Sequence, residues 1–206
     1  MRTLAIECAT EACSVALFDD GALLEGALEV LGRGHAERLV PMIAELPDRG
    51  RADRILVSLG PGSFTGVRVG LAAARGLALA WRADCLGYPT LALVATMALA
   101  QRKGPVSVCM AGGHGEWFVQ DFGADGMPEQ VLSSLTPEIA RQNARYSFAA
   151  GNKARELLQN DGSEQTTLDI LPDARHALLV PHALVTLDLA PFYGRAPDAK
   201  PAGKPA

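Results

Sequence analysis

Residues 58–81, SLGPGSFTGVRVGLAAARGLALAW, place a glycine-rich loop directly before a long run of apolar and small side chains. The preceding segment, RILVSLG at residues 54–60, is a short apolar run that predicts a strand leading into the loop. Residues 66–81 contain no proline and few polar side chains, so we expect them to form a helix. A strand, loop and helix in this order is typical of an α/β fold.

The glycine loop itself, GPGSFTG at residues 60–66, has two interpretations. Backbone amides at the start of a helix can bind an anion. The loop is not a Walker A motif, because Val67 and not lysine follows its last glycine, and its spacing matches neither GxGxxG nor GxSxG. The residues alone favour a tight turn in which Ser63 or Thr65 caps the helix. The loop residues that could contact an anion are Gly60, Gly62, Ser63, Thr65 and Gly66.

The helix expected at residues 66–81 is apolar on nearly all sides, and such a helix is buried in a core or against a partner. Arg68, Arg75 and Arg82 recur every seven residues and form one stripe along it. The pattern fits a core helix or an interface helix whose edge the stripe marks, and it does not separate the two.

The two halves of the chain show a similar order of strands and helices. In the first half we expect strands at 3–8, 13–18 and 22–30, a hairpin turn at 19–21, and helices at 34–46 and 87–101. In the second half we expect strands at 106–111 and 116–122, an extended return at 128–134, and short helices at 136–144 and 152–159. The repeat predicts a duplicated α/β unit. The expected domains are 1–103, a smaller and degenerate 104–196, and a disordered Pro/Ala/Lys-rich tail at 197–206.

Composition narrows the class of protein. The 206 residues are 49% hydrophobic and carry a net charge of −4, so the chain is globular and poorly suited to gripping a nucleic acid alone. Its four cysteines form no CxxC pair and indicate buried thiols in a reducing compartment. The apolar N-terminal stretch is short and is broken by Glu7, so it predicts a strand and not a signal peptide. We expect a cytoplasmic protein without a membrane segment.

Four stretches together resemble the TsaB (YeaZ) family of glycoprotease-like proteins. They are LAIECATEACSVAL at 4–17, GRGHAERLVPMI at 32–43, LGPGSFTGVRVGLAAARGLALA at 59–80 and APFYGRAPDAK at 190–200. The resemblance implies two RNase H-like lobes of the actin/Hsp70/sugar-kinase (ASKHA) type. It also implies a non-catalytic subunit of the tRNA threonylcarbamoyladenosine (t6A) machinery. The implied partners are a larger TsaD-like paralogue and a small TsaE-like ATPase, with tRNA contacted indirectly, and a homodimer is an alternative assembly.

The resemblance also implies roles for particular residues. The helices at 34–46 and 66–81 would pack against the equivalent pair of the paralogue or of a second copy. Glu7 and Thr10, at the end of the first strand, would lie beside the glycine loop on the ligand side of the cleft. Glu7 stands where the family usually has aspartate, and the loop before Glu116 lacks the family's usual Asp-Ala-Arg run. The expected interface residues are His35, Leu39, Ile43, Val67, Val69, Leu71 and Ala74.

Catalysis and metal binding are not expected of this chain. Its four histidines form no HxxxH pair of the kind that the catalytic paralogue carries, and there is no HExxH motif. We therefore expect no metal and no cofactor on this subunit, with ATP and metal on its partners. The alternative function is an independent nucleotide-binding enzyme of the sugar-kinase type that uses Glu7, Thr10 and the glycine loop. A third, weaker alternative is an M22-type glycoprotease.

Overall fold

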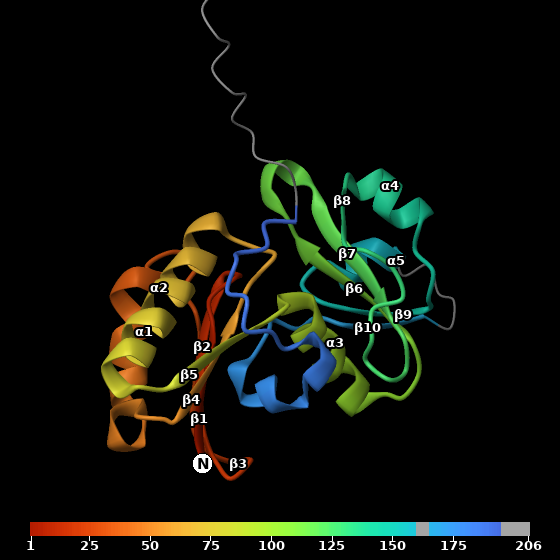
Figure 1. Ribbon diagram of the computed structural model, residues 1–206. Helices are drawn as coiled ribbons and strands as arrows, with labels where there is room; N and C mark the ends of the chain where they lie inside the picture. The colour runs from red at the N-terminus through yellow and green to blue at the C-terminus, as the bar shows by residue number, and fades with distance from the viewer. Residues whose placement is uncertain (160–164, 195–206) are drawn as a thin grey trace, which may run out of the picture.

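The computed structural model describes residues 1–159 and 165–194 and contains strands β1 to β10 and helices α1 to α5 (Figure 1). The first lobe contains β1 (Arg2–Glu7), β2 (Ala12–Asp19), β3 (Ala22–Val30), α1 (His35–Glu45), the 3₁₀ helix η1 (Pro47–Gly50), β4 (Arg54–Ser58), α2 (Phe64–Trp81) and β5 (Asp84–Tyr88). Helix α3 (Thr90–Gln101) leads to the second lobe. That lobe contains β6 (Val106–Ala111), the 3₁₀ helix η2 (Gly113–Gly115), β7 (Trp117–Phe122), β8 (Ser133–Leu135), α4 (Pro137–Gln142), β9 (Phe148–Ala150), α5 (Ala154–Leu158) and β10 (Thr166–Leu168). Two further 3₁₀ helices follow, η3 (Ala174–Leu179) and η4 (His182–Leu184).

The two sheets have the same topology. The first has the strand order β3-β2-β1-β4-β5, and the second has the matching order β8-β7-β6-β9-β10. In each sheet the first three strands along the chain pair antiparallel, while the last two lie parallel to the first. This duplication confirms the predicted α/β fold with two RNase H-like lobes of the ASKHA type.

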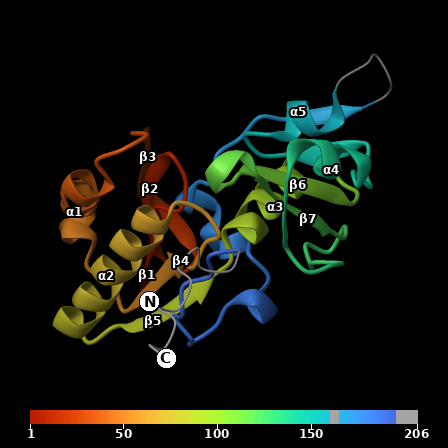
Figure 2. The same cartoon turned by 90° about the horizontal axis from the view of Figure 1, so that it is seen from above.

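Both faces of the first sheet are buried at its central strands β1, β2 and β4, because α1 and α2 cover one face while α3 and η3 cover the other (Figures 1 and 2). Leu4 and Ile6 of β1 point into the core beneath α1 and α2, whereas Ala5 points into the core between the sheets. Since side chains alternate along a strand, this burial on both sides explains why β1 and β2 are apolar almost throughout. Helix α3 lies between the lobes and is buried on nearly all sides.

Several expected elements differ from the structure, and the short helices expected at 136–144 and 152–159 are shorter than predicted. The helix expected at 87–101 begins at Thr90, because the preceding residues form the edge strand β5. Pro89 marks this boundary, since the residue before a proline favours extended backbone. Helix α2 begins two residues earlier than expected, at Phe64. The extended return expected at 128–134 is a strand only at Ser133–Leu135.

After the second lobe the chain returns to the first lobe, which the sequence did not indicate. The Ser14 hydroxyl donates to Asp173 at 3.3 Å, and Gly87 and Thr186 exchange two backbone hydrogen bonds. Helix η3 thus completes the core between the lobes. The domain boundary at residues 103 and 104 stays a prediction, and the tail at 197–206 lies outside the described residues.

Candidate functional site

The glycine loop joins β4 to α2 and lies against the turn between β1 and β2. The Ser63 amide donates to the Ala9 carbonyl oxygen at 2.6 Å, and a Cβ added to Gly62 would lie 1.8 Å from the same oxygen. A Cβ added to Gly66 would lie 2.0 Å from the Cys8 carbonyl oxygen. Glycine is required at positions 62 and 66 because backbone of this chain fills the space of a side chain.

Ser63 caps helix α2. Its hydroxyl oxygen accepts a hydrogen bond from the Gly66 amide at 3.2 Å, and its carbonyl oxygen accepts one from Val67 at 3.0 Å. Thr65 is exposed in the first turn of the helix. The tight-turn interpretation is therefore confirmed, with Ser63 and not Thr65 as the cap.

The other side of the loop is covered by residues near the end of the described chain. Gly60 has a φ of 93°, and a Cβ added there would lie 2.4 Å from the Phe192 carbonyl oxygen. A Cβ added to Gly194 would lie 2.9 Å from Pro61 and 2.6 Å from the Phe118 ring of the second lobe. The glycines of the loop are thus packed between the β1–β2 turn and the C-terminal segment, whereas residues 63–65, at the start of α2, are exposed.

Glu7, at the end of β1, is fully buried. Its Oε1 accepts a hydrogen bond from the Ala9 amide at 2.7 Å, whereas its Oε2 has no hydrogen-bond partner in the described part of the chain. Loss of hydration raises the pKa of this carboxyl to about 7, and the hydrogen bond from the Ala9 amide and the nearness of polar hydroxyl groups act in the opposite direction. These hydroxyls belong to Ser58, Thr90 and Tyr88.

Thr10 supports the same turn, since its hydroxyl oxygen accepts a hydrogen bond from the Ala12 amide at 3.2 Å. The structure thus places the expected anion-binding residues around one turn. Their polar groups are buried there or bonded within the chain, apart from the exposed Thr65. That they bind an anion or nucleotide stays a prediction.

The side chains expected at the interface mostly lie in the core of the first lobe, which corrects their assignment. They hold α1 and α2 to the sheet, and His35 Nε2 lies 3.2 Å from the Ala12 carbonyl oxygen. A helix that is apolar on all sides does not reveal which side faces inward. Here the side that carries these residues packs against the sheet. Only Val69 is half-buried. The exposed fractions of the others are His35 7%, Leu39 1%, Ile43 3%, Val67 1%, Leu71 3% and Ala74 0%.

The same two helices present a different set of small and apolar residues to solvent, which we call the outer helix face. Val40 is 55% exposed and Leu79 is 84% exposed, although both are aliphatic. The outer helix face consists of Ala36, Val40 and Ala44 of α1 with Ala72, Gly76, Leu79 and Ala80 of α2.

The arginine stripe borders the outer helix face. Arg68 donates from Nε to the Tyr193 hydroxyl at 2.9 Å, and Arg75 donates from Nη2 to the Leu189 carbonyl oxygen at 3.0 Å. Arg68 and Arg75 therefore bind the C-terminal segment to the edge of α2, and that the stripe marks the edge of an interface stays a prediction. Sequence reasoning missed this contact, although residues 190–200 were part of the family resemblance and so signalled a role.

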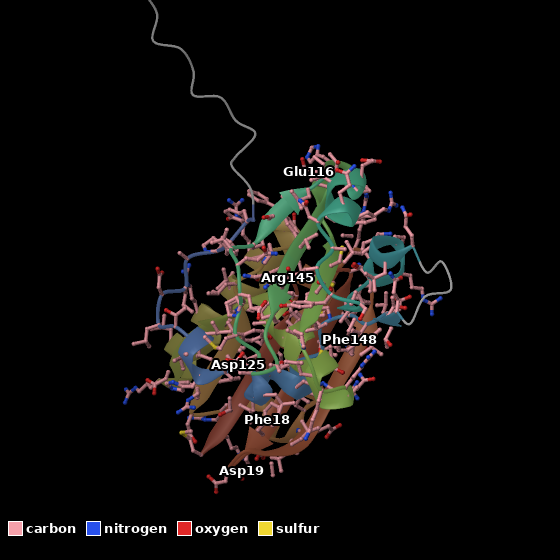
Figure 3. All side chains as sticks on the ribbon, turned by 90° about the vertical axis from the view of Figure 1, so that its right-hand side faces the viewer. Phe18, Asp19, Glu116, Asp125, Arg145 and Phe148 are labelled. Atoms are coloured by element: carbon pink, nitrogen blue, oxygen red, sulfur yellow. The ribbon has the colours of Figure 1, made fainter. Side chains whose placement is uncertain are left out.

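The loop before β7 contains no assembled cluster of metal ligands. Glu116, near the top of the second lobe in Figure 3, accepts a hydrogen bond from the Ser134 hydroxyl at 2.6 Å. His114 lies in η2 with a φ of 61°. Within residues 1–159 and 165–194, no three His, Cys, Asp or Glu side chains are grouped as a metal site, and no helix is long and apolar enough to cross a membrane.

Comparisons with known proteins identify relatives along most of the chain. The family model described as "TsaD: tRNA N6-adenosine threonylcarbamoyltransferase" matches residues 29–168. The tRNA threonylcarbamoyladenosine biosynthesis protein TsaB of Escherichia coli is 43% identical over 153 residues, which cover 69% of this chain and 65% of that protein. TsaB of Haemophilus influenzae is 32% identical, with 95% of this chain and 94% of that protein covered.

Solved structures agree with these relatives. YeaZ from Pseudomonas aeruginosa has a TM-score of 0.72 and 28% identity, covering 87% of this chain and 89% of that one. A second Pseudomonas aeruginosa structure, described as similar to peptidase YEAZ, has a TM-score of 0.74 at the same identity and coverage. The chain therefore belongs to the TsaB (YeaZ) family.

Proposed function

We propose that this chain takes part in t6A biosynthesis as a non-catalytic subunit. In this proposal it binds a larger TsaD-like paralogue, which transfers the threonylcarbamoyl group to N6 of adenosine 37 in tRNAs that read ANN codons. A TsaE-like ATPase joins the complex, and ATP and metal bind to the partner subunits. Membership of the TsaB family supports the pathway, because the Escherichia coli and Haemophilus influenzae relatives are named for it.

The observation that carries the supporting role is the packing of the glycine loop. Gly62 and the Ser63 amide contact the Ala9 carbonyl group on one side of the loop, and Gly60 contacts the Phe192 carbonyl group on the other. Phosphate binding at a helix N-terminus needs amides that point at an open site. A loop whose glycines pack against the chain's own backbone is better suited to fixing the direction of α2 toward a partner than to surrounding a substrate.

The outer helix face supports binding of a partner protein. It combines small residues, which let two helix layers approach closely, with the exposed side chains of Val40 and Leu79. Burying each of these two would contribute roughly 1.5–3 kcal/mol, before the entropy cost of association.

Binding of the paralogue tests this proposal. Leu79→Glu is expected to abolish co-purification with the TsaD-like protein, because it places a charge within the outer helix face. Val131→Glu is the matched control, since Val131 is also 84% exposed but lies outside the outer helix face, in the second lobe. Leu71→Glu would be uninformative, because Leu71 is 3% exposed and its loss would damage the core. Wild-type binding by Leu79→Glu would refute the interface.

The pathway is tested in cells. Depletion of the gene should lower threonylcarbamoyladenosine in total tRNA, measured by mass spectrometry of nucleosides, and the Val131→Glu variant should restore it while Leu79→Glu should not. Normal nucleoside levels after depletion would contradict a role in this pathway.

One observation favours the alternative, a nucleotide-binding enzyme of the sugar-kinase type. Glu7 combines full burial, a raised pKa and an Oε2 without a partner in the described chain, and such carboxyls occur at functional sites. Calorimetric titration of the isolated protein with ATP and Mg²⁺ separates the two functions. Tight binding that Glu7→Gln abolishes would favour the enzyme.

A further inference from the structure

Two aromatic rings hold the side chain of Arg68 at the first turns of α2. Its guanidinium carbon lies 3.4 Å from the centre of the Phe64 ring and 5.4 Å from the centre of the Tyr193 ring. The two ring centres are 5.0 Å apart, and Arg68 Nε donates to the Tyr193 hydroxyl at 2.9 Å. We call these three residues the arginine clamp.

The clamp orients an exposed charge. Phe64 is 55% exposed and Arg68 is exposed, so neither side chain is held by burial in the core. In the described part of the chain, only Nε of the guanidinium has a hydrogen-bond partner, which leaves both terminal nitrogens, Nη1 and Nη2, to face solvent. A planar guanidinium fixed in this way can donate two parallel hydrogen bonds, and less side-chain entropy remains to be lost when it does so.

The clamp is continuous with the outer helix face. Arg68 precedes Ala72 of that face by one helical turn, and Arg75 lies one further turn along the same edge. Helix α2 contains no acidic residue that could neutralise these charges. A partner that covers the outer helix face would therefore contact a cation at the rim of the interface, beside an exposed aromatic ring. Arginine and aromatic residues are typical of the positions that contribute most to binding.

We propose that the arginine clamp is a preformed binding site for a carboxylate, and that it pairs with an Asp or Glu side chain of the protein partner at the edge of the interface. This inference rests on the proposed function, because the partner is the protein that covers the outer helix face. The clamp also explains why the C-terminal segment lies along α2. Tyr193 comes from that segment, so the segment takes part in partner binding without entering the helix layer.

A phosphate has similar hydrogen-bonding geometry, and a tRNA backbone could present one. The chain carries a net charge of −4, and arginines spaced seven residues apart beside apolar side chains do not form the clustered basic surface that nucleic-acid binding needs. Continuity with the outer helix face favours a protein carboxylate, and binding of tRNA becomes an outcome that the experiment can detect.

The test measures the affinity of the full-length chain for the purified TsaD-like paralogue, by calorimetric titration without tRNA at two salt concentrations. Arg68→Ala is expected to weaken binding roughly tenfold, and the loss should shrink at high salt. Arg68→Lys should recover little, because an ammonium group cannot donate as a planar fork. Tyr193→Phe should have a smaller effect, since it keeps the ring and removes only the hydroxyl. Arg51→Ala, at an exposed position outside α1 and α2, is the control and should bind like the wild type.

The outcomes separate this proposal from the proposed function. If Leu79→Glu abolishes binding while Arg68→Ala binds like the wild type, the clamp proposal is overturned and the interface stands. If neither variant weakens binding, both proposals fail. If Arg68→Ala leaves the protein complex intact but weakens binding of tRNA to that complex, the clamp binds phosphate and the carboxylate proposal is wrong. Thermal melts of each variant check that the chain remains folded.

Discussion

Replacing Glu7 by glutamine is expected to stabilise the fold at neutral and alkaline pH and to remove part of its pH dependence. Glu7 is fully buried, and burial raises the pKa of its carboxyl from 4.5 to about 7. The folded state therefore holds the proton more tightly than the unfolded state does. The stability that depends on the neutral carboxyl is fully present below pH 4.5 and is lost as the pH rises through 7.

The pKa shift sets the size of the effect. At about 1.4 kcal/mol for each pH unit, the rise of the pKa from 4.5 to about 7 corresponds to about 3.5 kcal/mol well above pH 7. About 2.5 kcal/mol of this loss of stability is expected as the pH rises from 5 to 8. Glutamine cannot ionise, and its amide can still accept the hydrogen bond from the Ala9 amide and donate toward the Thr90 hydroxyl, which has no partner in the described chain.

Urea unfolding of the wild type and of Glu7→Gln at pH 5 and pH 8 measures this difference. We expect the wild type to lose about 2.5 kcal/mol more stability than the variant over this range. Glu37→Gln, at an exposed position on α1, is the control and should follow the wild type. If wild type and Glu7→Gln lose the same free energy of unfolding between pH 5 and pH 8, burial of an ionisable Glu7 does not govern the pH dependence.

Two further predictions concern the glycine loop and are read out by thermal unfolding. Gly62→Ala should destabilise the fold by about 1–3 kcal/mol or more, because its Cβ would collide with the Ala9 carbonyl group. Gly76→Ala is the matched control. It has open space around it and should stabilise α2 by about 0.5–1 kcal/mol. Equal effects of these two substitutions would contradict the packing described for the loop. Ser63→Ala should cost about 1 kcal/mol through loss of the helix cap, and Thr65→Ala should change stability little; a neutral Ser63→Ala would argue against the cap.

Most elements of the first lobe were predictable from the sequence because their signals are local. The hairpin between β2 and β3, the helix α1 and the strand before the glycine loop follow from turn residues and from side-chain periodicity. Strand β5 was missed because a run of a few apolar residues before Pro89 does not distinguish a strand from the start of a helix. The short elements of the second lobe were located less closely for the same reason.

The candidate site was predictable only in part. The sequence narrowed the helix cap to Ser63 or Thr65, whereas the need for glycine at positions 62 and 66 depends on the backbone of Ala9 and Cys8, which lie in another part of the chain. The orientation of α2 did not follow, because a helix that is apolar all round has no distinct inner side. The sequence therefore identified the two helices that present an apolar surface. The side chains predicted to form the interface, such as Leu39 and Leu71, instead lie in the core.

The amino-acid sequence by itself determined the duplicated α/β pattern, the tight turn before α2 and the resemblance to the TsaB family, because each depends on residues close together in the chain. Only the tertiary structure decided which residues of α1 and α2 meet solvent, that Phe192 covers the glycine loop, and that Tyr193 clamps Arg68. The exposed sides of α1 and α2 are set by their packing on the first sheet. The other two features join residues more than a hundred positions apart, which the packing of the chain against itself brings together.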